Sequence, residues 1–141
     1  MTTFSRRLVA ETRLDTADLI WPLFVIEGQN MAEPIDAMPG VFRYSIDQLL
    51  QQAAKAVELT IPAIAIFPSI DATLKDETGS LARDGDNLVC RAVSAVKAAF
   101  PDLGIICDVA LDPFTTHGHD GLLDADEILN DETIAVLCEQ A

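Results

Sequence analysis

Short apolar runs alternate with segments of helical periodicity along this chain, and the alternation indicates its fold class. The runs at 20–26, 61–67 and 103–109 are rich in branched and aromatic side chains, which predicts buried strands. Apolar residues at helical spacing follow the first two runs, and a third helical pattern closes the sequence. Strands that alternate with helices in this way predict a parallel sheet with helices packed outside it.

The first helical segment has a clear expected beginning and end. Ser45 followed by Gln48 forms a capping-box pattern, and the helix is predicted to end near Leu59. Thr60 follows, and a left-handed backbone there, which glycine adopts easily, would cost threonine about 1 kcal/mol relative to glycine. The face predicted to be buried comprises Ile46, Leu49, Leu50, Ala53 and Val57.

The remaining segments are predicted in the same way. Residues 68–86 are polar and contain two glycines, so we expect an extended loop. A second helix is predicted over 87–100, capped by Asp84 or Asp86. Asn130 is expected to cap the third helix.

Two architectures satisfy this order of elements: an open doubly wound sheet, or part of an eight-stranded barrel. No glycine-rich phosphate loop follows any of the strands, which disfavours a nucleotide-binding open sheet. A complete barrel takes about 250 residues, so these 141 residues would supply only about three β-α units. Such a sector would leave its barrel-facing side and one edge exposed, so on its own it is expected to be unstable or oligomeric.

Charge and hydropathy exclude several classes of function. The net charge of −14, from 23 acids and 9 bases, disfavours binding to nucleic acid or to anionic membranes. No apolar stretch approaches the roughly 20 residues of a membrane-spanning helix, and the N-terminus lacks the apolar core of a signal peptide. A cytoplasmic location is expected.

The three cysteines, Cys90, Cys107 and Cys138, are odd in number and far apart. They show neither a disulfide framework nor zinc-ligand spacing, which fits a reducing compartment. Each is predicted to be a small core residue.

Acidic and histidine side chains crowd the loop after the third apolar run. Asp108, Asp112 and Asp120 lie there together with His117 and His119. Charged groups where a buried strand meets a loop cost free energy unless they bind or react with something. In a barrel, active sites form at this carboxyl end of the strands. The alternative is that Asp108 terminates the strand through hydrogen bonds and the rest is a solvated loop.

The same loop resembles a known family. Residues 108–121, DVALDPFTTHGHDG, are similar to the signature of porphobilinogen synthase, also called delta-aminolevulinic acid dehydratase. Segments 38–43, 61–68 and 128–133 resemble further family segments in the same order. The resemblance implies a partial TIM barrel, the N-terminal part of a single barrel domain in a homo-oligomer. Residues 1–19 would be the remnant of an arm that wraps a neighbouring subunit, and 20–141 the first three β-α units, cut within the third helix.

The resemblance also implies an activity. The family condenses two molecules of 5-aminolevulinate to porphobilinogen with loss of two waters, in tetrapyrrole (heme) biosynthesis. It works through lysine Schiff bases, which make a ketone electron-poor. Lys55, Lys75 and Lys97 match none of the family's catalytic lysine motifs and are expected to be surface residues. The isolated chain is therefore expected to be inactive.

A metal preference follows from the same resemblance. Some family members hold zinc with three cysteines in this loop, at positions that are Ala110, Asp112 and Asp120 here. Alanine cannot bind a metal and carboxylates prefer hard ions, so magnesium is a possible cofactor and an active-site zinc is not expected. Asp112 and Asp120 would bind a cation, act on substrate, or simply replace the cysteines. Asp108 would orient substrate or a catalytic group.

Two other functions remain open from the residues. His117 and His119 could hold a divalent ion with Asp108, as in a barrel-type metal-dependent hydrolase. The chain could also be a non-catalytic protein that folds only against a partner.

Overall fold

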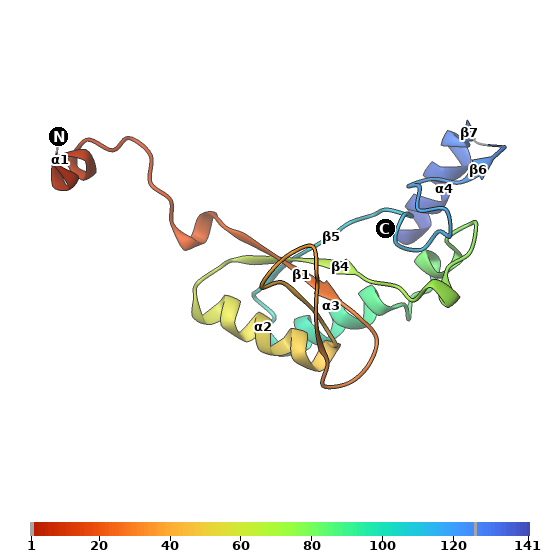
Figure 1. Ribbon diagram of the computed structural model, residues 1–141, viewed down its shortest axis with the longest axis horizontal. Helices are drawn as coiled ribbons and strands as arrows, with labels where there is room; N and C mark the ends of the chain where they lie inside the picture. Colours follow the sequence, from red (N-terminus) through yellow and green to blue (C-terminus); the bar gives the residue numbers. More distant parts are fainter. Residues whose placement is uncertain (1, 126) are drawn as a thin grey trace.

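A five-stranded sheet forms the centre of the computed structural model, which describes residues 2–125 and 127–141 (Figure 1). In sheet order, the strands are β2 (Ala32–Pro34), β3 (Phe42–Tyr44), β1 (Ile20–Val25), β4 (Ala63–Pro68) and β5 (Gly104–Cys107). β1 pairs in parallel with β3 and β4, and β4 pairs in parallel with β5. The predicted parallel α/β class is confirmed.

Two of these strands were not expected from the sequence. β2 and β3 lie in the segment between the first strand and the first helix, and they pair antiparallel to each other. Each has only three residues, too short for a period-2 pattern to emerge. An ion pair between Arg43 and Glu33, at 3.2 Å, crosses this pair of strands.

Helices α2 (Ile46–Glu58) and α3 (Leu88–Ala99) cover one face of the sheet (Figure 1). Their apolar faces and the alternate residues of the strands form the main core. Its fully buried members include Val25, Leu49, Ala53, Ala56, Ile64, Ala92 and Val96. The predicted face of α2 is correct except at Val57, which is 46% exposed, because Ala56 instead faces the sheet.

The predicted N-cap residue of α2 is correct, but its predicted hydrogen bonds are wrong. Ser45 is the N-cap of α2, yet its hydroxyl accepts a hydrogen bond from the backbone N–H of Met31 and donates one to Asp47. The Gln48 amide donates to Asn30, so the capping box is absent. The pairing of β2 with β3 brings residues 30 and 31 close to the helix. Hydrogen bonds to these two residues engage the side chains of Ser45 and Gln48, which therefore do not cap the helix.

The N-caps of the other two predicted helices are not the predicted residues. Asn87, not Asp84 or Asp86, accepts the N–H of Cys90 and begins α3. Asn130 is the first residue of α4 (Asn130–Gln140) and not its cap. Thr60 has φ of +58°, so the backbone after α2 is left-handed and threonine bears the cost of that conformation.

A second, smaller core lies beyond the carboxyl end of the sheet. It joins the 3₁₀ helix η3 (Ser80–Arg83), the loop after β5 and α4, through the buried residues Ala82, Leu111, Phe114 and Val136. The short strands β6 (Leu123–Asp124) and β7 (Glu127–Ile128), which pair antiparallel, precede α4. A further 3₁₀ turn, η2 (Ala72–Leu74), follows β4. The segment predicted as an extended loop is thus partly ordered as single turns.

The N-terminal residues extend away from this body (Figure 1). They contain the short helix α1 (Thr3–Leu8) and the 3₁₀ turn η1 (Thr16–Asp18). Phe4, Leu8 and Leu14 are mostly exposed there. Within residues 2–125 and 127–141, no helix is long and apolar enough to cross a membrane.

The expectation for the cysteines is wrong. Cys107 and Cys138 are exposed and Cys90 is half-buried, so none is a core residue. Cys107 is the last residue of β5, and Cys138 lies on the outer side of α4, where packing from the described residues is sparse.

Candidate active site

Asp108 directly follows the last residue of β5, so it lies at the carboxyl end of the parallel strands as predicted. Its side chain is exposed. Groups at this edge of the sheet are not engaged in hydrogen bonds between strands. Such positions can therefore bind a substrate or take part in a reaction.

The loop beyond Asp108 folds back on itself. The backbone N–H groups of Phe114 and Thr115 both donate to the carbonyl of Leu111, at 2.9 and 3.0 Å. The Asp120 carboxylate accepts the N–H of Leu111 at 2.6 Å, which returns the far end of the loop to its beginning. Thr115, almost fully buried, donates its hydroxyl to the carbonyl of His119. These bonds place Asp120 next to the turn that carries Asp112.

The three acids of the loop share one electrostatic environment. Partial burial raises the pKa of Asp112 above its ordinary value, and the charges of Asp120 and Asp108 raise it further. Lys75 opposes this shift in the pKa of Asp112. Carboxylates that lie close enough to repel one another at the carboxyl end of a strand are typical of a site that binds a cation or a cationic substrate.

The two histidines do not form a metal site with Asp108. His117 accepts the N–H of His119 at its Nδ1, so its Nε2 carries the proton and donates to the carbonyl of Glu77 at 3.1 Å. Both ring nitrogens of His117 are therefore engaged. Among residues 2–125 and 127–141, no three His, Cys, Asp or Glu side chains gather as a potential metal cluster. The ligand set of the hydrolase alternative is not assembled.

The acidic side chains of the loop offer oxygen donors and no thiolate. Ala110 is buried and offers no donor, while Asp112 and Asp120 offer carboxylate oxygens. Magnesium is commonly held by one or two carboxylates and keeps several of its waters. Partial burial raises the pKa of the nearby Cys107 thiol, and Cys90 adds to the shift, which disfavours the thiolate form of Cys107.

Sequence reasoning missed the loop that packs against this site. Residues 75–80, which belong to the connection between β4 and α3, lie alongside the loop after β5. Lys75, predicted to be a solvated surface residue, is half-buried and close enough to influence Asp112. The alternation of Asp76, Thr78 and Ser80 was the available signal, because these residue types form side-chain-to-backbone turns.

The other two lysines are surface residues, as predicted. Lys55 is exposed and donates to Gln52 on its own helix. Lys97 donates to the carbonyls of Pro101 and Leu103 and so stabilises the end of α3.

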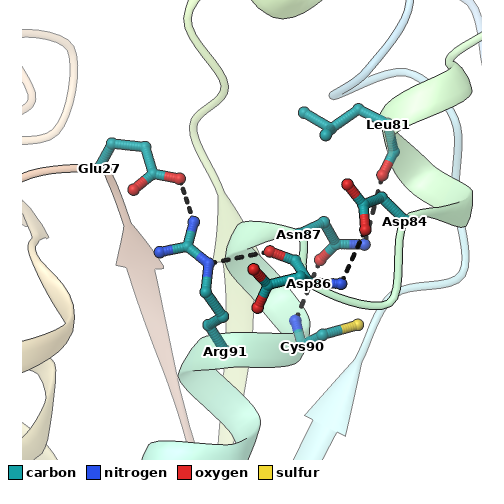
Figure 2. Close-up of polar contacts among 7 residues, drawn as sticks. All are labelled: Glu27, Leu81, Asp84, Asp86, Asn87, Cys90 and Arg91. Carbon is teal, nitrogen blue, oxygen red and sulfur yellow. Dashed lines mark hydrogen bonds and ion pairs between the residues drawn. The ribbon is translucent and has the colours of Figure 1, made fainter.

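A polar network at the beginning of α3 fixes the same connection to β1 (Figure 2). Arg91 forms an ion pair with Glu27, which lies just beyond the end of β1, and donates to the carbonyl of Asp86. Asn87 donates to the carbonyl of Leu81 in η3. The segment just beyond the carboxyl end of β1 is thereby tied to the connection that reaches the site.

Comparisons with known proteins agree with this geometry. The family model described as delta-aminolevulinic acid dehydratase matches residues 1–141. A delta-aminolevulinic acid dehydratase from Bradyrhizobium diazoefficiens is 58% identical over 138 residues, covering 98% of this chain and 39% of the relative. A chloroplastic delta-aminolevulinic acid dehydratase from Pisum sativum is 43% identical over 138 residues, covering 96% of this chain and 34% of the relative.

Part of a solved structure has a closely similar backbone. The delta-aminolevulinic acid dehydratase (porphobilinogen synthase) of Toxoplasma gondii ME49, in complex with the reaction product porphobilinogen, superposes with a TM-score of 0.94 at 39% identity. The match covers 99% of this chain and 40% of that one, so the chain spans about one third to two fifths of the length of these relatives. The described sheet and helices therefore correspond to a sector of that barrel. This chain belongs to the delta-aminolevulinic acid dehydratase family.

Proposed function

We propose that these residues form the N-terminal part of a single barrel domain in a porphobilinogen synthase. The complete protein would condense two molecules of 5-aminolevulinate to porphobilinogen with loss of two waters. The observation that supports this most is the group of three acids beyond β5, in a backbone that superposes closely on a relative solved with porphobilinogen.

The acids fit the substrate's chemistry. The amino group of 5-aminolevulinate is cationic at neutral pH, and a group of carboxylates attracts it to the carboxyl end of the strands. Asp108 orients the substrate or a catalytic group there, and Asp112 and Asp120 set the charge of the site. The raised pKa of Asp112 makes this carboxyl a better proton carrier than an ordinary aspartate.

The Schiff-base lysines belong, in this proposal, to a part of the protein outside these 141 residues. A lysine that attacks a ketone must lose its proton, which requires burial or cationic neighbours. Lys75 is instead only half-buried and lies close enough to Asp112 to influence the pKa of that carboxyl. Lys55 and Lys97 point to other partners away from the loop.

The further features of the proposal are a magnesium ion, a homo-oligomer and a cytoplasmic location. Asp112 and Asp120 would hold the magnesium, which would offset their mutual repulsion. The exposed apolar residues Phe4, Leu8 and Leu14 suit contact with a second copy of the chain.

Removal of metal from the complete protein by a chelator tests the metal assignment. Magnesium added afterwards is expected to bind and to restore activity, and Asp112→Asn should lose both the binding and the restored activity. Restoration by zinc alone contradicts the metal assignment.

A chimera tests the activity. Residues 1–141 are joined to the remaining C-terminal part of the Bradyrhizobium relative, and porphobilinogen formed from 5-aminolevulinate is measured. The chimera is expected to be active, and Asp108→Asn is expected to lower kcat by about 10²-fold or more. Asp102 is an exposed aspartate that precedes the other end of β5, so Asp102→Asn is the matched control and should leave kcat unchanged. A folded chimera that makes no product contradicts the proposal.

A further inference from the structure

The loop of residues 75–80 is built around a single carboxylate. Asp76 Oδ1 accepts the N–H of Thr78 at 2.8 Å, its hydroxyl at 2.9 Å, and the N–H of Ser80 at 3.1 Å. Its Oδ2 accepts the hydroxyl of Ser80. These bonds, led by that of the Ser80 side chain, hold the pKa of Asp76 well below its usual range. Four donors on one carboxylate fix the path of the chain between residues 76 and 80.

The backbone of this same segment binds the loop that carries the proposed site. The N–H of Asp76 donates to the carbonyl of Phe114 at 3.3 Å, and the N–H of Thr116 donates to the carbonyl of Asp76 at 3.0 Å. These bonds form an isolated parallel bridge between Asp76 and Thr115. The His117 ring extends the contact by donating to the carbonyl of Glu77.

Packing between the two loops is close. Gly79 is buried with φ of +60°, and a Cβ added there would lie 3.3 Å from Thr115 and 3.5 Å from Phe114. Both of those residues are almost fully buried. The contact is thus a packed interface between two β-α units, held in shape by the carboxylate bonds of Asp76.

We infer that Asp76 is a positioning residue for the reaction: its side chain holds residues 75–80 in the shape that fixes residues 111–117, and with them Asp112, against the end of β5. The inference rests on the proposed function of that site. Asp76 itself bonds to Thr78 and Ser80 and does not have to touch the substrate. Its effect is expected in kcat, because small displacements of reacting groups slow the chemical step.

The test compares two substitutions of Asp76 in the full-length protein. Asp76→Ala removes all four acceptor bonds, and kcat is expected to fall by about 10²-fold. Asp76→Asn keeps Oδ1 as the acceptor of three bonds, and its amide can donate to a reoriented Ser80 hydroxyl. It is expected to recover most of the lost kcat. Exchange of the Thr116 amide, which donates to Asp76, should accelerate in Asp76→Ala and stay slow in Asp76→Asn.

Asp71 provides a matched control on the same connection. It accepts the N–H and the hydroxyl of Thr73 at 2.8 and 2.6 Å, in a similar turn. Asp71→Ala is expected to leave kcat and Thr116 exchange unchanged. All variants are assayed well below their unfolding temperatures and normalised to folded protein, so lost stability does not imitate lost catalysis.

Each outcome decides the inference. Wild-type kcat in Asp76→Ala refutes it, and so does an Asp76→Asn variant as slow as Asp76→Ala, because hydrogen-bond geometry would then not be the cause. An increase in KM with kcat unchanged also refutes it. Absence of porphobilinogen formation by the unsubstituted full-length protein refutes the proposed function, and this inference with it.

Discussion

Asp112 and Asp76 show two opposite uses of an aspartate. Partial burial and like charges raise the pKa of Asp112, so its ionised form weakens the folded state. Donors from Ser80 and Thr78 lower the pKa of Asp76, so its ionised form strengthens the folded state. The first is typical of a residue kept for function and the second of one kept for structure.

Substitution of Asp112 by Asn is expected to stabilise the protein while it removes activity. An acid with a raised pKa in the folded state causes a penalty that develops above the unfolded pKa of about 3.9 and is full at neutral pH. Asp112→Asn should therefore gain stability over the wild type at about pH 7, and the gain should vanish below about pH 4. Urea unfolding with a chelator present measures this; lower stability than wild type at neutral pH contradicts it.

Asp76→Ala should show the opposite sign. A depressed pKa contributes stability that is present above the unfolded pKa of about 3.9 and is lost as pH falls toward the folded pKa. The loss of stability in Asp76→Ala is expected to be full at about pH 7 and to shrink in acid. Asp76→Asn, which does not titrate, should differ from Asp76→Ala by the same amount at every pH. A difference between wild type and Asp76→Ala that is independent of pH contradicts the charge contribution.

Among the elements, β4 and β5 approach each other unusually closely at one point. The N–H of Gly104 donates to the carbonyl of Pro62 at 2.8 Å, and a Cβ at Gly104 would lie 3.0 Å from that carbonyl and 3.0 Å from the Cβ of Ala63. Because β5 carries Asp108 at its end, this contact also sets the position of the proposed site.

Gly104→Ala is expected to destabilise the full-length protein by about 1–3 kcal/mol, because the added methyl group forces the two strands apart. Gly85→Ala is the matched control: nothing lies within 4 Å of its Cβ and its φ is not positive. That substitution should be neutral or stabilising, by about 0.4–1 kcal/mol. Equal unfolding midpoints for the two variants in urea contradict the close approach.

Over the whole molecule, one face of the sheet has no helix among the described residues (Figure 1). Apolar side chains remain on that side: Ile20 is 53% exposed and Ile106 46% exposed. The relative of known structure is a longer chain, of which this one corresponds to 40%. We expect the remaining part of the proposed barrel to cover this face.

Assembly from two separately produced parts tests that expectation. This chain alone should be inactive and should bind a fluorescent apolar dye through the exposed face. Addition of the C-terminal part should reduce dye binding, give a defined oligomer by sedimentation and produce porphobilinogen. Ile106→Asp should prevent assembly, whereas Val57→Asp, at the same 46% exposure but on α2, should permit it. Unchanged size and dye binding after mixing contradict the expectation.

Local patterns along the chain were enough for the parallel α/β class, the two main helices and the location of Asp108 at a strand end. Each depends on residues close together in the sequence, through periodicity or backbone preference. Strands β2 and β3, the partners of Ser45, and the pairing of Asp76 with Thr115 were not predictable in this way. They join segments far apart in the chain, where long-range packing determines which hydrogen bonds form. The proximity of Lys75 to Asp112 arises from the same long-range contact.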